Sequence, residues 1–194
     1  MKKYIKKILA LFIILATFIS CQDDYQPKPR GYFRIQLPQK EYIRFEHKSF
    51  PYSFNMPIYA KITKPRTQAE KYWINVSFPN FKAKLHISYK PIHHNLDTLL
   101  NDVHKMMNKH IPKANAINEQ MFLNNEINVY GMAYEIKGSE AASPYQFYLT
   151  DSTNHFLRGA LYFNFSPNND SLKPVINFLQ QDVQELIDSF RWEE

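Results

Sequence analysis

The sequence has one cysteine and only four glycines among its 194 residues. A lone thiol cannot close a disulfide within the chain, which excludes a disulfide-stabilised scaffold. So few glycines argue against a loop that wraps backbone amides around a phosphate, and the P-loop, GxGxxG and HExxH motifs are all missing. The chain therefore carries no motif of a nucleotide-binding protein or of a zinc protease.

The net charge of +6 is concentrated at the N-terminus. Lys2, Lys3, Lys6 and Lys7 supply four positive charges, and residues 1–20 contain no acid. Without these lysines the 24 basic residues fall to 20, against 18 acidic residues, which leaves a net charge of +2. A nearly neutral domain lacks the basic surface that nucleic acid requires, so we expect no nucleic-acid partner.

An export signal explains the basic N-terminus. The lysines precede Ile8–Ile19, an apolar run that is shorter than a membrane-spanning helix but typical of a secretory signal peptide. The run leads to Ser20 and Cys21, a small residue before the only cysteine, as in the lipobox of a bacterial lipoprotein. Phe18 stands where a lipobox usually has Leu. We expect residues 1–20 to be a lipoprotein signal peptide and Cys21 to be the lipid attachment site.

Residues 21–30 are predicted to form the lipidated N-terminus and a tether. Asp23 and Asp24 do not enter a bilayer, and Pro27 and Pro29 favour an extended path of about 3 Å per residue. Two interpretations of the aspartates stay open: a solvated tether, or an acidic signal for export to the cell surface. We expect a lipid anchor in the cell envelope, first at the periplasmic face of the outer membrane, with the inner membrane or the cell surface as alternatives.

Alternating apolar and polar residues predict two strong β-hairpins. One covers Tyr72–Tyr89, and the other covers Tyr145–Phe165, with a turn at the polar residues 151–154. In the second hairpin, one face of the returning strand collects Leu157, Gly159, Leu161, Phe163 and Phe165, which we expect to be buried. Weaker patterns predict a strand over residues 31–37, two edge pieces within 50–62, and two strands over 116–123 and 127–136. Gly131, within the last of these, marks either a bulge or a close packing contact.

Apolar residues at helical spacing predict two helices. They cover Leu96–Lys109 and Leu172–Phe190, and Pro174 falls in the first turn of the second helix. The predicted fold class is α+β: a single domain over residues 31–194 with a mainly antiparallel sheet packed by two amphipathic helices.

The candidate chemical groups favour structural roles. His93 and His94 are adjacent, so on a strand they point to opposite faces, and no third ligand stands at metal-binding spacing. Asp151, Ser152 and His155 have the residue types of a catalytic triad, but they lie within one turn and lack a glycine-flanked nucleophile elbow. We interpret them as turn residues, and we expect no catalytic residues, no metal and no cofactor.

Arg158 is the one charge between apolar neighbours in its strand. Two interpretations stay open: an arginine on the outer face of the sheet whose guanidinium reaches solvent, or an anchor for an acidic partner. We retain Arg158 as the candidate partner contact. His86 is expected on an outward strand face together with Lys84 and Ser88.

Three segments resemble the GldD family of gliding motility lipoproteins of Bacteroidetes. They are PKPRGYFRI at Pro27–Ile35, FPNFKAKLHISYK at Phe78–Lys90, and QFYLTDSTNHFLRGALYFNFSPNNDSL at Gln146–Leu172, and the similarity extends over essentially the whole mature chain. The resemblance implies a role in gliding over surfaces and in the type IX secretion machinery. The family has no established catalytic residues to transfer to this sequence.

Two functional hypotheses follow. The first is a non-enzymatic, lipid-anchored accessory or assembly protein that contacts protein components of the gliding and secretion machinery. The alternative is an envelope binding module for a glycan or lipid, with exposed Tyr and Trp side chains as a stacking platform, and a hydrolase ranks third. A flat aromatic or basic patch would favour a partner, whereas an enclosed pocket with convergent polar groups would favour a ligand.

Overall fold

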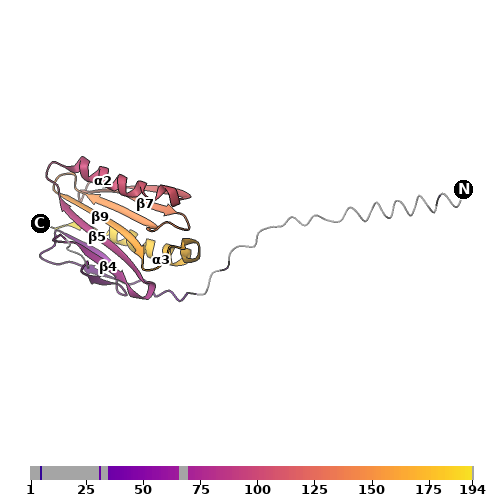
Figure 1. Ribbon diagram of the computed structural model, residues 1–194. Coiled ribbons are helices and arrows are strands. Elements are labelled where there is room, and N and C mark those ends of the chain that lie inside the picture. Colours follow the sequence, from indigo (N-terminus) through magenta and orange to yellow (C-terminus); the bar gives the residue numbers. More distant parts are fainter. Residues whose placement is uncertain (1–4, 6–30, 32–34, 66–69, 194) are drawn as a thin grey trace. The chain divides into compact units, whose positions relative to one another are not determined.

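The computed structural model describes residues 5, 31, 35–65 and 70–193. Its main element is a seven-stranded sheet in the order β3-β4-β5-β9-β8-β7-β6, in which every neighbouring pair is antiparallel (Figure 1). The strands are β3 (Lys61–Thr63), β4 (Ile74–Phe78), β5 (Ala83–Pro91), β6 (Ala116–Asn124), β7 (Val129–Lys137), β8 (Tyr145–Thr150) and β9 (His155–Phe163).

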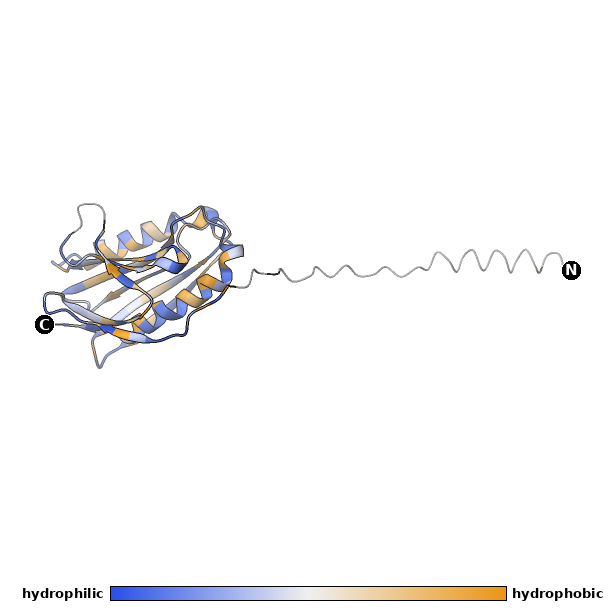
Figure 2. Cartoon of the chain, turned by 90° about the horizontal axis from the view of Figure 1, so that it is seen from below, coloured by the Kyte–Doolittle hydropathy of each residue, from blue (hydrophilic) through white to orange (hydrophobic). Residues whose placement is uncertain are grey.

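A second, three-stranded sheet has the order β1-β2-β10. Its strands are β1 (Tyr42–Phe45), β2 (Tyr52–Pro57) and β10 (Arg191–Trp192), and two helices complete the domain, α2 (Leu96–Asn108) and α3 (Asn169–Asp188). Both helices carry apolar and polar residues on different sides (Figure 2). Within the described residues, this is the predicted α+β domain with a mainly antiparallel sheet and two amphipathic helices.

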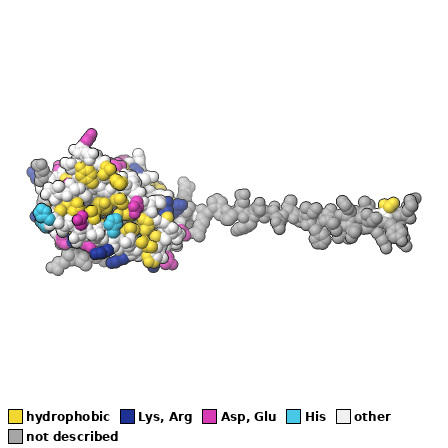
Figure 3. Space-filling model, turned by 90° about the horizontal axis from the view of Figure 1, so that it is seen from above, with side chains coloured by type: hydrophobic (Ala, Val, Ile, Leu, Met, Phe, Trp, Pro, Cys, Tyr) yellow, Lys and Arg dark blue, Asp and Glu magenta, His cyan; other side chains and the backbone are white. Residues whose placement is uncertain are grey.

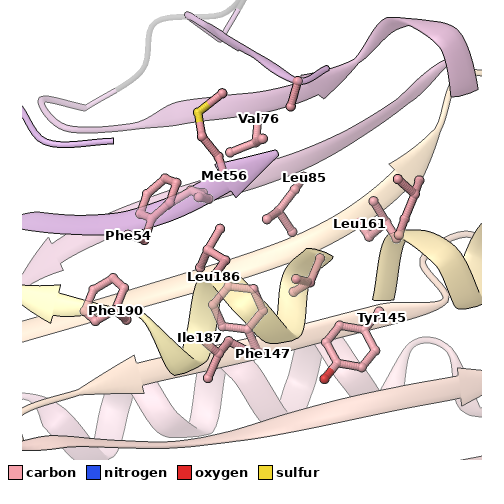
Figure 4. Packing of buried hydrophobic residues seen from close by; sticks show 14 of the residues in the cluster. Phe54, Met56, Val76, Leu85, Tyr145, Phe147, Leu161, Leu186, Ile187 and Phe190 are labelled. Carbon is pink, nitrogen blue, oxygen red and sulfur yellow. The ribbon is translucent and has the colours of Figure 1, made fainter. Parts of the chain in front are cut away.

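The large sheet is covered on both faces. On one face, α3 and the small sheet close the larger hydrophobic core, in which Phe54 of β2, Phe147 of β8 and Leu186 of α3 are at most 2% exposed (Figure 4). On the other face, α2 packs Leu99, Val103 and Met107 against residues of β7 and β9 in a smaller cluster. Full burial of a large apolar side chain contributes about 1.5–3 kcal/mol, so the two clusters together hold the three layers in place.

The predicted hairpin at Tyr145–Phe165 is confirmed as β8 and β9, and its turn depends on one carboxylate. Oδ1 of Asp151 accepts hydrogen bonds from the backbone amides of Thr153, Asn154 and His155 at 3.0, 2.8 and 2.8 Å. An aspartate that satisfies several amides of its own turn is the short-range chemistry expected at such a position. These hydrogen bonds lower the pKa of Asp151 although its partial burial acts in the opposite direction.

Gly131 and Gly159 permit close contacts within the sheet. A Cβ at position 131 would lie 2.1 Å from the carbonyl oxygen of Tyr148, and one at 159 would lie 2.2 Å from the ring of Phe147. The pairing of β7 with both neighbours continues through Gly131, so this glycine marks a close packing contact, not a bulge.

The structure corrects the prediction for the start of the domain. Residues 35–40 form no strand, and Ile35 and Leu37 are exposed, whereas the predicted residues 32–34 lie outside the described part of the chain. The first strand is β1, beginning at Tyr42. Alternation over so few residues did not identify a strand, because Ile35 and Leu37 pair with no strand among the described residues.

Three further predictions are corrected. Tyr52–Pro57 is the central strand of the small sheet, not an edge piece, because β10 pairs with its second side. Phe165 follows the end of β9 and is 40% exposed, unlike Leu157 and Leu161. Helix α3 begins at Asn169, so Pro174 lies in its second turn, and the buried Phe190 follows the helix.

Candidate functional site

A cavity of about 590 Å³ opens between α2 and strands β4, β5 and β9. Helix α2 lies over the β7 and β9 side of the sheet, and the same face of β4 and β5 carries polar side chains instead of apolar ones. Lys84, His86 and Ser88 of β5 and Arg158 of β9 line the cavity from the sheet. Figure 3 shows the molecule from the α2 side, where apolar side chains gather between histidine and charged groups.

Arg158 lies at the floor of this cavity. In the sheet its Cα is paired with Ser88 on one side and Tyr148 on the other. Its Nη2 donates a 2.6 Å hydrogen bond to Oε1 of Gln146, and its Nε is buried without a partner among the described residues. Burial lowers the pKa of the guanidinium, and the Tyr162 hydroxyl opposes that effect. Arg158 therefore lies on the sheet face that α2 partly covers, in a cavity instead of in open solvent, and its role as a partner contact stays a prediction.

Gln146 connects Arg158 to the end of helix α2. Its Nε2 donates to Nε2 of His110 at 2.8 Å, and its side chain is 1% exposed. Because an amide NH₂ can only donate, the His110 ring nitrogen must accept, which requires a neutral imidazole. Burial first, and then the charge of Arg158, lowers the pKa of His110, in agreement with this neutral form. The chain of contacts fixes the direction of the Arg158 side chain.

His86 lies on β5, next to the strand of Arg158 and two residues from Ser88, which pairs with Arg158. Its Nδ1 is 2.6 Å from Oδ1 of Asn75, and its ring forms a T-shaped pair with the Tyr162 ring, with centroids 5.6 Å apart. Burial, followed by the charges of Lys84 and Arg158, lowers the pKa of His86. The expected outward position of His86 with Lys84 and Ser88 is confirmed, and the strand face that the three side chains share lines this cavity.

The cavity also has an apolar side. Helix α2 contributes Leu99, Val103 and Met106, and Phe156 of β9 contributes an aromatic ring. The sequence did not predict a cavity that combines these apolar side chains with the polar face of the sheet. The alternation of the 72–89 hairpin did place Asn75, Lys84 and His86 on one face. No local pattern shows that a distant helix stops short of that face.

The other candidate residues take structural positions. His155 Nδ1 lies 2.7 Å from the Tyr89 hydroxyl, and its ring stacks on Trp192 with centroids 5.0 Å apart. Asp151 is hydrogen-bonded within its own turn, and Ser152 is exposed. Asp151, Ser152 and His155 therefore have the geometry of turn and packing residues. His93 and His94 lie in a bend before α2 instead of on a strand, and both are exposed.

Cys21, the predicted lipid attachment site, lies outside the described residues, as do the other residues of the predicted tether. Within the described part of the chain, no group of three or more His, Cys, Asp or Glu side chains is placed to hold a metal ion. None of the helices described is both long enough and apolar enough to cross a membrane.

Strand β6 forms a second exposed feature at the far edge of the sheet. It pairs with β7 on one side and with no described strand on the other. Met121 and Leu123 are 62% and 71% exposed, so this nine-residue edge carries apolar side chains beside backbone groups that no described strand pairs. Long, uncovered edges of this kind are templates for pairing with another chain.

In its described residues the chain is an α+β protein with two surface features, the cavity beside α2 and the edge of β6. The family model of the gliding motility lipoprotein GldD matches residues 22–192, and the chain belongs to this family. It is therefore a gliding motility accessory lipoprotein with a membrane-anchored place in the envelope.

Comparison with curated proteins gives no match. Among solved structures, the chain is similar to the solution structure of cyanobacterial PsbP (CyanoP) from Synechocystis sp. PCC 6803, with a TM-score of 0.47 and 10% identity. The similarity covers 83% of this chain and 98% of that one.

Proposed function

We propose that the protein is a non-catalytic accessory component of the gliding and type IX secretion machinery that acts by protein–protein contact. A diacylglycerol-modified Cys21 holds it at the periplasmic face of the outer membrane, and the tether keeps the domain clear of the headgroups. Membership of the GldD family supports a role in gliding motility, and the edge of β6, which no described strand covers, supports a contact with another protein. An extended segment of a machinery protein is the occupant that this edge fits best.

The chemistry of β6 explains this choice. A strand added to an open edge gains main-chain hydrogen bonds, and alternate side chains supply specificity. Met121 and Leu123 lie two residues apart, hence on one face of the strand, and both are exposed. Strand β3, at the opposite edge, has three residues and offers a much shorter template.

Charged side chains on β6 test the contact. Met121→Lys combined with Leu123→Lys places two charges on the edge, which opposes strand addition without removing a buried side chain. We expect the double variant to remain folded and membrane-associated, to lose crosslinks to machinery proteins in the native envelope, and to impair gliding. The matched control is Ile43→Lys on β1, an edge strand of the small sheet, where the apolar side chain is also exposed.

Unchanged crosslinks and normal gliding in the β6 double variant would contradict the proposed contact.

The non-catalytic role has its own test, because Ser152 and His155 are the residue types that a hydrolase would need. Cells with Ser152→Ala and His155→Ala should glide and secrete normally. Loss of gliding by a folded, correctly localised double variant would favour a hydrolase instead.

A further inference from the structure

The cavity beneath α2 contains cationic groups without matching carboxylates. Arg158 and Lys84 form no ion pair in the described part of the chain, and the buried Nε of Arg158 has no acceptor there. Because this Nε is inaccessible, the other nitrogens of the Arg158 guanidinium are the donors that can reach a ligand in the cavity that Arg158 lines. Within the described residues, neutral groups contact the guanidinium: Oε1 of Gln146 accepts from Nη2, and the Tyr162 hydroxyl also interacts with it.

The remaining charges at the cavity are already compensated. Lys90 lies 3.9 Å from Glu70, and Asp102, the one acid among the described lining residues, lies 3.7 Å from Lys105. The uncompensated charge of the site is therefore positive and comes from Arg158 and Lys84. A guanidinium matches the planar oxygens of carboxylate and phosphate, and such charge-assisted hydrogen bonds are the stronger ones.

The other side of the cavity suits hydrocarbon. Leu99, Val103 and Met106 face it from α2, and Met106 is 41% exposed at its rim. A volume of about 590 Å³ lies within the range of small-molecule sites and accommodates an anionic group together with an alkyl segment. A purely inorganic anion would leave these apolar side chains uncovered.

We propose that this cavity binds an amphipathic anion, with its phosphate or carboxylate on Arg158 and Lys84 and its alkyl segment along Leu99, Val103 and Met106. Gln146 positions the guanidinium. The site is separate from the partner contact, because β6 lies at the other end of the sheet from β4 and β5.

Titration calorimetry on the full lipidated protein in phosphatidylcholine nanodiscs tests the proposal, with empty nanodiscs as the blank for partitioning. The probes are hexyl phosphate, hexanoate, inorganic phosphate and hexanol. We expect saturable binding of at least one alkyl anion and binding at least about 10-fold weaker for inorganic phosphate and for hexanol, because each lacks one half of the interaction. Preference between hexyl phosphate and hexanoate distinguishes a phospholipid-like ligand from a fatty acid.

Three variants locate the site. Arg158→Gln should weaken binding of the preferred probe about 10-fold or more, since it removes the half-buried cation. Lys84→Gln, at a partly exposed side chain, keeps the test valid if Arg158→Gln folds poorly, and it should also weaken binding. Lys48→Gln, at an exposed turn between β1 and β2 that does not line the cavity, is the control and should bind normally.

The proposal is overturned if no alkyl anion produces heat above the empty nanodiscs, or if hexanol binds as tightly as the anions. It is also overturned if Lys84→Gln and a folded Arg158→Gln both bind like the wild-type protein. None of these results bears on the β6 contact, which is measured by crosslinking.

Discussion

Lys40 Nζ lies 2.6 Å from Oδ1 of Asp182, a carboxylate on α3 that is only 1% exposed. The same carboxylate accepts hydrogen bonds from the hydroxyls of Tyr42 at 3.0 Å and Tyr59 at 2.5 Å. Burial and the neighbouring Asp182 raise the pKa of both tyrosines, so both remain donors. One side chain thus fastens the segments on either side of β2 to the last helix.

Asp182→Ala should therefore destabilise the domain. It leaves the amine and two hydroxyls without their shared acceptor, and breaking such a buried pair costs about 3 kcal/mol. Urea unfolding measures the loss, and Gln181→Ala, at an exposed neighbouring position, should stay within about 0.5 kcal/mol of wild type. Equal midpoints for the two variants would show that this carboxylate does not hold the segments.

Gly159→Ala should overpack the core of the hairpin. The added methyl meets the Phe147 ring, which is fully buried and cannot swing into solvent, so we expect a loss of about 1–3 kcal/mol. Phe147→Leu should restore part of it when combined with Gly159→Ala, and a double-mutant cycle measures the coupling. Strictly additive losses would refute the direct contact.

The stability of the domain should fall in acid partly through His110. Its folded pKa lies below the ordinary 6.5, so the unfolded chain takes up a proton first as the pH falls below that value. The contribution is complete above pH 6.5 and decreases toward the folded pKa. His110→Gln should flatten the dependence in urea unfolding at a series of pH values, whereas His93→Gln, at an exposed bend, should not. Parallel curves for wild type and His110→Gln would contradict this.

Cys21→Ala should release the protein from membranes without unfolding it. The acyl chains of a lipoprotein provide stable attachment because each buried methylene contributes about 0.8 kcal/mol. Fractionation and incorporation of radiolabelled lipid measure the change, with Ser152→Ala as a control that should stay anchored. Lipid incorporation that continues without the thiol would exclude Cys21 as the attachment site.

The amino-acid sequence by itself determined the regular elements with strong local patterns. Alternation between Ile74 and Tyr89 and between Tyr145 and Phe163 specified both hairpins, and the spacing of Leu99, Val103 and Met107 specified α2. These patterns are local because the direction of each side chain follows from its own backbone period. The polar turn around Asp151 was equally predictable, since its hydrogen bonds join residues at most four apart.

Only the tertiary structure decided what covers each face. The residue pattern around Arg158 does not distinguish an arginine in open solvent from an arginine in a cavity. The surroundings of Arg158 depend on where α2, some fifty residues earlier in the chain, ends its contact with the sheet. Likewise, β10 has two residues and no period of its own, yet its pairing with Tyr52 and Ser53 makes β2 a central strand. Contacts between distant segments are set by packing and closure of the whole chain, which no short stretch of sequence contains.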